Sequence, residues 1–309
     1  MNNVFPSRLV RIAGHILTVL SLVYVFLKLR DSFGSLLPVR FDVTGMGYLF
    51  SGILFWCTAF VTTTYAWILL LGEEGKGLSF RHAFIVMGKS QIAKYLPGNV
   101  FHYVGRVALG TQKGLSSGAV ILSSGMEAFL AAINGFILAM MSVLLNPEAL
   151  PFITAHIPPG SRLALVLVAL CAGGIVLFFY RSHAASWLRE RRSFFRPARI
   201  LAVIGIYMSV FLLFGIVLKI LLAGLWDIHP GLNWYQFSCG FALAWWLGFI
   251  TPGAPGGIGI REAVFVTLFG SQLGDGIAIG LAILIRIMTT LSDVFTFIIA
   301  LVIDRRAMK

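Results

Sequence analysis

The chain has 309 residues, of which 58% are hydrophobic and only 12% are charged. Soluble domains carry about 25% charged residues, so this composition excludes a soluble globular protein and is typical of a polytopic membrane protein. The formal net charge of +12 does not indicate a nucleic-acid-binding protein, because the basic residues cluster in loops beside apolar runs, where they orient a membrane protein.

Eight apolar runs predict membrane-spanning helices, since a span needs about 20 apolar residues. We expect them near residues 10–29, 47–71, 117–145, 162–181, 200–223, 234–251, 258–274 and 277–303. The seventh run is short. The first predicts an uncleaved span rather than a signal peptide, because no small-residue cleavage site follows it. The sequence therefore predicts an all-α polytopic protein in which residues 1–309 form a single integral membrane domain.

Lysine and arginine are concentrated on one side of these spans. The segment between the fourth and fifth spans holds six arginines against one glutamate, whereas residues 146–161 and 224–234 contain no lysine or arginine. Cytoplasmic loops carry the excess of positive charge in membrane proteins. We therefore expect a multi-pass protein of the bacterial inner (cytoplasmic) membrane with both termini in the cytoplasm.

Proline and glycine interrupt the apolar pattern at two places. Proline lacks a backbone donor and glycine adopts angles that other residues avoid, so a regular helix cannot pass through either place. Irregular backbone at membrane depth is tolerated where protein or a water-filled cavity covers it. We predict a re-entrant hairpin that turns between residues 84–96 and 100–109, and a broken helix later in the chain. The residues at the breaks are Pro97 and Gly98 in the first, and Pro252, Gly253, Pro255, Gly256, Gly257 and Gly259 in the second.

The two breaks share a spacing. Arg106 follows Pro97 by nine residues, and Arg261 follows Pro252 by nine residues. Matched interrupted segments in two halves of a chain point to a transporter binding site between inverted repeats. A chance match in a glycine-rich chain is the alternative. If the repeat is real, its halves lie near residues 47–181 and 200–303.

Polar residues also lie inside the predicted spans. Glu127 and Asn134 are seven residues apart in one span, and Arg286 and Asp293 are seven apart in the last. Such a spacing puts both side chains on one helix face, and a charge at this depth costs roughly 3 kcal/mol unless it is paired or hydrated. Buried ion pairs, for example Glu127 with Arg286, are one interpretation. A polar central cavity is the other, and its candidate head-group-binding residues are Arg106, Glu127, Asn134, Arg261, Glu262, Arg286 and Asp293.

No catalytic constellation is evident. The three cysteines and six histidines show no metal-ligand spacing, so we expect neither a metal nor a cofactor. His102 and Trp245 are expected to pack or to anchor the protein. The Gly256-Gly257-Ile258-Gly259 run is not a dinucleotide motif because no strand precedes it, although it could present backbone donors to an anion.

Two segments resemble a known family. Residues 94–98 with Gly105-Arg106, and residues 251–262, resemble the lysylphosphatidylglycerol synthase transmembrane-region family. This family is the flippase-like half of multiple peptide resistance factors and also occurs as stand-alone proteins. The resemblance covers nearly the whole chain in span order. It implies an eight-span core with re-entrant segments that moves a lipid head group between leaflets. The family's soluble aminoacyl-transfer domain has no counterpart in these residues, so the substrate does not carry over.

The expected function is therefore that of a lipid translocase for a phospholipid or a polyprenyl-phosphate-linked lipid. Arg106 and Arg261 would hold the phosphate, and the carboxylates would balance charge or bind a cationic head group or a proton. The alternative is a membrane-embedded transferase that uses Glu262, beside Arg261, as base on a lipid-linked donor; we find no nucleotide or metal motif for it. Expected partners are the lipid, a lipid-modifying synthase or glycosyltransferase, and a second copy of the chain.

Overall fold

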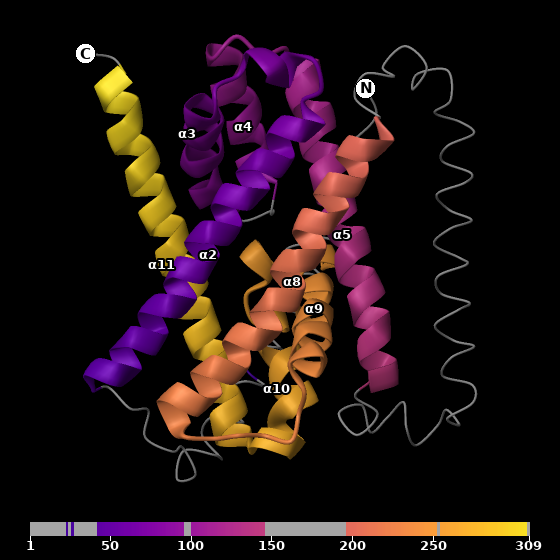
Figure 1. The fold of residues 1–309 in the computed structure, drawn as a ribbon, viewed down its shortest axis with the longest axis vertical. Coiled ribbons are helices and arrows are strands. Elements are labelled where there is room, and N and C mark those ends of the chain that lie inside the picture. The colour runs from indigo at the N-terminus through magenta and orange to yellow at the C-terminus, as the bar shows by residue number, and fades with distance from the viewer. Residues whose placement is uncertain are drawn as a thin grey trace.

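A computed structural model describes residues 42–95, 100–145, 196–251 and 254–307, together with Val23, Phe26 and Leu27 (Figure 1). Every regular element in these ranges is a helix, which confirms the predicted all-α class. The spans predicted at 10–29, apart from those three residues, and at 162–181 lie outside the described residues, as do Pro97, Gly98, Pro252 and Gly253.

Four helices are long and apolar enough to cross a membrane. They are α2 (Val43–Leu70), α5 (Ser117–Leu145), α8 (Pro197–Trp226) and α11 (Asp275–Ala307), each close to a predicted span. The α2 helix begins after Asp42, whose side chain accepts a hydrogen bond from the Gly45 N–H at 2.7 Å, a favourable N-cap. The α8 helix begins with Pro197, at the position where the missing N–H costs nothing.

Between these long helices lie two helical hairpins, shown in Figure 1. The first consists of α3 (Phe80–Gln91), the short helix η3 (Ile92–Tyr95) and α4 (Phe101–Gln112), and it enters the bundle from the upper end of the view. The second consists of α9 (Trp234–Ile250), η5 (Pro255–Gly257) and α10 (Ile260–Leu273), and it enters from the lower end. The short helices η3 and η5, which we call the hairpin turns, contact each other inside the bundle.

The two arms of the second hairpin are the segments predicted as spans at 234–251 and 258–274. Its helices have 17 and 14 residues, or about 26 and 21 Å of helix, against a hydrocarbon core of about 30 Å. Its turn is built from glycines in the left-handed region, with φ of 57° at Gly256, 71° at Gly257 and 83° at Gly259. Residues with a side chain rarely adopt these angles, so the glycine-rich segment ends one helix and begins the next.

The order of elements occurs twice with opposite direction. In Figure 1, α2 runs upward, the first hairpin returns to the upper end, and α5 runs downward. The α8 helix then runs downward, the second hairpin returns to the lower end, and α11 runs upward. Two inverted repeats would have this order. The proposed halves, 47–181 and 200–303, stay a prediction, because part of the first half lies outside the described residues.

Small residues let these helices approach closely, as is common in membrane proteins. Gly215 of α8 packs against the backbone of Trp234 and the Ser238 side chain on α9. A Cβ added to Gly88 of α3 would lie 2.8 Å from the Cβ of Ala300 on α11. The outer surface carries large exposed apolar side chains, as expected where helices face lipid.

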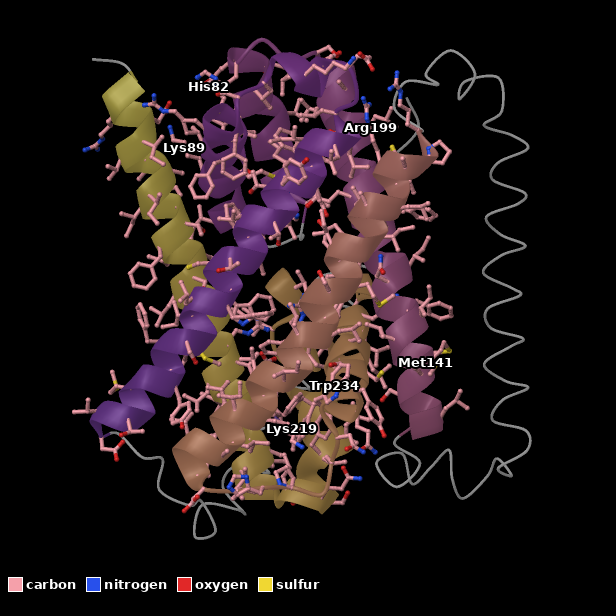
Figure 2. The ribbon with its side chains drawn as sticks, viewed as in Figure 1. His82, Lys89, Met141, Arg199, Lys219 and Trp234 are labelled. Carbon is pink, nitrogen blue, oxygen red and sulfur yellow. The ribbon has the colours of Figure 1, made fainter. Side chains whose placement is uncertain are left out.

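The two ends of the bundle differ in charge. Figure 2 shows His82, Lys89 and Arg199 at the upper end and Lys219 and Trp234 in the lower half. The upper basic residues share few acidic partners: Asp304 binds Lys89 at 2.7 Å and Lys113 at 3.1 Å. This asymmetry agrees with a cytoplasmic upper end, and the orientation itself stays a prediction.

Candidate functional site

A cavity of about 270 Å³ lies in the centre of the bundle, between the two hairpins and the long helices. Its wall contains Tyr95 from η3 and Gly256 from η5. A Cβ built on Gly256 would lie 3.9 Å from the Tyr95 ring, so the two hairpin turns meet at this cavity. The charged residues in the wall are Lys94, Arg106, Glu127, Arg261, Glu262, Arg286 and Asp293. Six of these were candidates from the sequence, and Lys94 is an addition.

Asn134 is the candidate that the structure does not bring to the cavity. Its side chain is fully buried within the bundle, and its amide nitrogen donates to the Leu130 carbonyl at 2.9 Å on the same helix. Its position seven residues from Glu127 places it further along α5, beyond the cavity wall. A role in packing within the bundle fits Asn134 better than ligand binding.

The first ion pair joins Arg106 of α4 to Glu127 of α5. Arg106 is only 3% exposed, and the Tyr207 hydroxyl donates a second hydrogen bond to Glu127 at 2.8 Å. The predicted pairing of Glu127 with Arg286 is therefore wrong. Because α4 packs directly on α5, Arg106 lies beside the Glu127 carboxylate. Both oxygens of that carboxylate are bound, one by Arg106 and the other by Tyr207.

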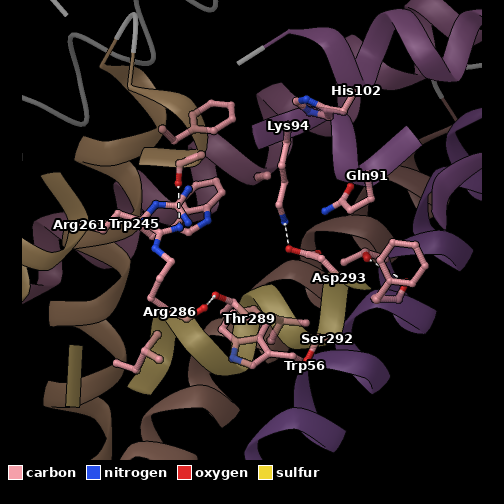
Figure 3. A pocket seen from close by; sticks show the side chains of 18 of the residues that line it. Trp56, Gln91, Lys94, His102, Trp245, Arg261, Arg286, Thr289, Ser292 and Asp293 are labelled. Atoms are coloured by element: carbon pink, nitrogen blue, oxygen red, sulfur yellow. Dashed lines mark hydrogen bonds and ion pairs between the residues drawn. The ribbon is translucent and has the colours of Figure 1, made fainter. Parts of the chain in front are cut away.

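The second and third ion pairs tie α11 to the two hairpin turns. Arg286 donates from Nε to Glu262 at 2.7 Å and from Nη1 to the Gly256 carbonyl at 3.2 Å. Seven residues further along α11, Asp293 accepts from Lys94 at 2.6 Å and from the Tyr95 hydroxyl at 2.5 Å. Figure 3 shows Lys94 pointing toward Asp293 across the cavity.

Glu262 also shapes the backbone of its own hairpin. Its second carboxylate oxygen accepts a hydrogen bond from the Gly259 N–H at 2.7 Å. This bond satisfies one of the free donors at the start of α10, and a negative charge in the first helical turn is favourable. One carboxylate therefore fixes both the helix start and the Arg286 side chain.

Arg261 is different from the other basic residues. Within the described ranges, no carboxylate lies within ion-pair distance of its guanidinium and no hydrogen bond reaches it. The guanidinium lies over the Trp245 ring, 5.6 Å from the ring centroid (Figure 3), and Trp245 in turn stacks on Phe249 at 5.0 Å. Trp245, expected only to pack or anchor, therefore holds a cation at the cavity wall.

Two glycines make room for the Arg261 side chain. A Cβ on Gly248 would lie 2.5 Å from Arg261 Cγ, and one on Gly257 would lie 2.6 Å from its Nε. Real Cβ atoms do not approach other atoms so closely. The hairpin therefore leaves a slot that only the arginine stem fills, and this slot fixes where the guanidinium lies.

The wall of the cavity has one positive charge in excess, since it holds four basic and three acidic side chains. Buried nitrogen atoms of five wall residues make no hydrogen bond to a described residue: Trp56 Nε1, His102 Nδ1, Arg106 Nε, Arg261 Nε and Arg286 Nη2. The indole and guanidinium nitrogens are donors, and the role of the imidazole nitrogen depends on its tautomer. The complement of such a wall is an anion with several acceptor oxygens, which arginine binds well through two parallel bonds.

The comparison with protein families agrees with the motifs and the fold. The family model described as the lysylphosphatidylglycerol synthase TM region matches residues 12–296. The chain belongs to this family. A search of the curated proteins finds no match.

Lys94, Tyr95 and Tyr207 are site residues that were not predicted from the sequence. A lysine three residues before the Pro97 break was the available signal for the first two, because a charge in an otherwise apolar hairpin needs a partner.

His102 lines the cavity beside Tyr103, with 3.8 Å between the ring centroids, and its Nδ1 makes no hydrogen bond to a described residue. Within the described ranges, no cluster of three or more metal-ligating side chains occurs.

Proposed function

We propose that this protein moves the phosphate-bearing head group of a membrane lipid between leaflets through the central cavity. The observation that carries the proposal is Arg261, a guanidinium without an ionic partner among the described residues, set between two hairpin turns in a cavity whose other charges are paired. A phospholipid and a polyprenyl-phosphate-linked lipid both offer the oxygen atoms that it needs.

The hairpins support a path for a head group. Each one reaches the cavity from a different end of the bundle (Figure 1), so each forms the barrier on one side. The head group would bind to Arg261 in the cavity while the lipid tails stay in the bilayer. Arg106, expected to share this task, is committed to Glu127, and we assign the phosphate to Arg261.

The transferase alternative is weaker because it needs a carboxylate base. Glu127, Glu262 and Asp293 each bind a basic side chain and accept a further hydrogen bond. A carboxylate that holds a buried cation would have to give up that contact to act on a substrate, which leaves the cation unpaired. A cavity in which every carboxylate is held in this way suits binding better than proton abstraction.

The proposal also has a cellular setting. We place the protein in a bacterial cytoplasmic membrane with both termini on the cytoplasmic side, supported by the basic upper end of the bundle. A lipid-modifying synthase or a glycosyltransferase would supply the lipid, and a second copy of the chain is a further candidate partner.

Leaflet exchange in vesicles tests the function. Vesicles with and without the purified protein would contain fluorescent phosphatidylglycerol in both leaflets, and an impermeant reductant would quench the outer leaflet. We expect quenching beyond the outer-leaflet fraction with the natural protein and with Lys219→Gln, a charge removal outside the cavity, and its loss with Arg261→Gln. Mass spectrometry of the recovered lipid should show no covalent change, and a modified lipid would instead favour the transferase.

A further inference from the structure

Each carboxylate of the cavity is already paired with one of the protein's own cations. Glu127 binds Arg106, Glu262 binds Arg286, and Asp293 binds Lys94. The second oxygens of Glu127 and Glu262 accept from the Tyr207 hydroxyl and the Gly259 N–H, and the Asp293 oxygen that binds Lys94 also accepts from the Tyr95 hydroxyl. A cationic ligand would compete with the protein's own cations for these carboxylates, and a buried cation left without its partner is costly.

Three of the protein's own cations also lie over aromatic rings. Arg261 lies over Trp245, Arg106 lies over Trp67 and Tyr103, and Lys94 lies over Tyr95, all at 5.4 to 5.8 Å. An ammonium ligand would have to displace one of these cations to bind the same ring face.

The remaining features all favour negative charge. The wall carries one excess positive charge, and four of its five unpartnered buried nitrogens, those of Trp56, Arg106, Arg261 and Arg286, are donors. In a site of low effective dielectric, unit charges interact much more strongly than they do in water. The sign of the head group's net charge is therefore the property that most affects its binding in the cavity.

We infer that the cavity selects lipids whose head group carries a net negative charge and rejects aminoacylated lipids whose head group is net positive. This inference rests on the proposed function and narrows its substrate class. The ligand is a phosphate with neutral, hydroxyl-bearing substituents or none. Arg261 is the residue that makes the cavity prefer a negatively charged head group. A glycerophospholipid phosphodiester and a polyprenyl phosphate share this chemistry.

Binding to the full-length protein in detergent micelles tests the inference separately from transport. Apparent affinities would come from lipid-dependent shifts of Tm for four probes: phosphatidylglycerol, lysyl-phosphatidylglycerol, lysyl-phosphatidylglycerol acetylated on both amines, and undecaprenyl phosphate. The second probe differs from the first by the lysyl group, and acetylation restores the negative net charge while keeping the added size. The fourth probe distinguishes the two lipid sources.

We expect phosphatidylglycerol to bind at least about tenfold more tightly than lysyl-phosphatidylglycerol, as a two-charge difference at an effective dielectric of about 20 allows. The acetylated lipid should bind nearly as well as phosphatidylglycerol. Arg261→Gln makes the wall neutral and should reduce the ratio of the first two affinities to near one, whereas Lys219→Gln should keep it. Tighter binding of undecaprenyl phosphate than of phosphatidylglycerol would assign the polyprenyl source, and the reverse order the glycerophospholipid source.

Two results would overturn the inference. Equal binding of phosphatidylglycerol and lysyl-phosphatidylglycerol would show that charge is not read, and rejection of the acetylated lipid would show that size is read instead. Neither result would change what the vesicle assay shows about leaflet exchange. Conversely, charge-selective binding without leaflet exchange would contradict the translocase proposal and leave the cavity as an anionic-lipid binding site.

Discussion

The Cγ atom of Arg261 occupies the space that Gly248 leaves open on the opposite arm of the same hairpin. Gly248 lies on α9 and Arg261 on α10, and a Cβ on the glycine would lie 2.5 Å from that carbon. The missing side chain on one arm therefore fixes the direction of the charged side chain on the other. An unpaired guanidinium keeps one position because its stem is held, with Trp245 beneath its plane.

The Gly248→Ala substitution should displace Arg261 and weaken anion binding roughly tenfold, because one charge-assisted hydrogen bond stabilises by about 1.5–3 kcal/mol. Gly205→Ala on α8 is the matched control, since a Cβ there meets nothing within 4 Å. Both changes favour the helix by a similar amount. The measurement is phosphatidylglycerol affinity together with Tm, and equal affinities of the two variants would contradict the slot.

The Arg261→Lys substitution should lower leaflet exchange while preserving the preference for anionic lipid. Lysine keeps the charge but loses the planar fork that binds two phosphate oxygens at once and that stacks on Trp245. We expect affinity for phosphatidylglycerol between that of the natural protein and that of Arg261→Gln. A lysine variant with unchanged exchange would show that charge alone is needed.

Arg106 and Glu127 should behave as one unit in a double-mutant cycle. Removing one partner of a buried ion pair costs roughly 3–5 kcal/mol because the other charge is left unpaired, so Arg106→Gln and Glu127→Gln should each destabilise strongly and the double variant by less than their sum. The measurement is the free energy of unfolding in detergent. Glu127→Gln combined with Arg286→Gln should be additive, because the two residues belong to different pairs.

Two substitutions at Glu262 should separate its two contacts. Glu262→Gln retains an oxygen that can accept from the Gly259 N–H but removes the charge that pairs with Arg286, whereas Glu262→Leu removes both. Losing a helix N-terminal hydrogen bond costs about 1 kcal/mol. We therefore expect the free energy of unfolding of the leucine variant to be lower than that of the glutamine variant by about 1 kcal/mol, with a lower Tm. Equal Tm values would show that the Gly259 bond does not contribute.

Single cysteines should establish the orientation of the bundle. Gly77, between α2 and α3 at the upper end, and Gly231, between α8 and α9 at the lower end, are both exposed, and a Cβ at either meets nothing within 4 Å. In a background without the three natural cysteines, Gly231→Cys should react with an impermeant thiol reagent in intact cells. Gly77→Cys should react only after permeabilisation, and the opposite result would reverse the topology.

The positions of the elements could be predicted from the sequence because their causes are local. Apolar length predicted the long helices, and proline and glycine predicted the two breaks, with Gly256, Gly257 and Gly259 adopting the expected special angles. The depth of the second hairpin was not predictable, since an apolar run of 17 residues fits either a crossing or half a hairpin.

The contents of the site were predictable in part. Charges at membrane depth need partners, which is why six candidate charges line one cavity. Their pairing was not predictable, because position along a helix does not say which helix is its neighbour. Glu127 binds Arg106 rather than Arg286 for this reason, and Asn134 turns to its own helix backbone.

The α11 helix binds both hairpin turns, one through Arg286 and the other through Asp293. The two residues are seven positions apart, or about 10.5 Å along the axis, and the hairpins enter from opposite ends. A slide of α11 along its own axis would therefore carry both turns in the same direction. One hairpin would be drawn deeper into the bundle while the other was pushed out toward its own membrane face, so a single rigid helix would make the opening of one barrier and the closing of the other the same movement.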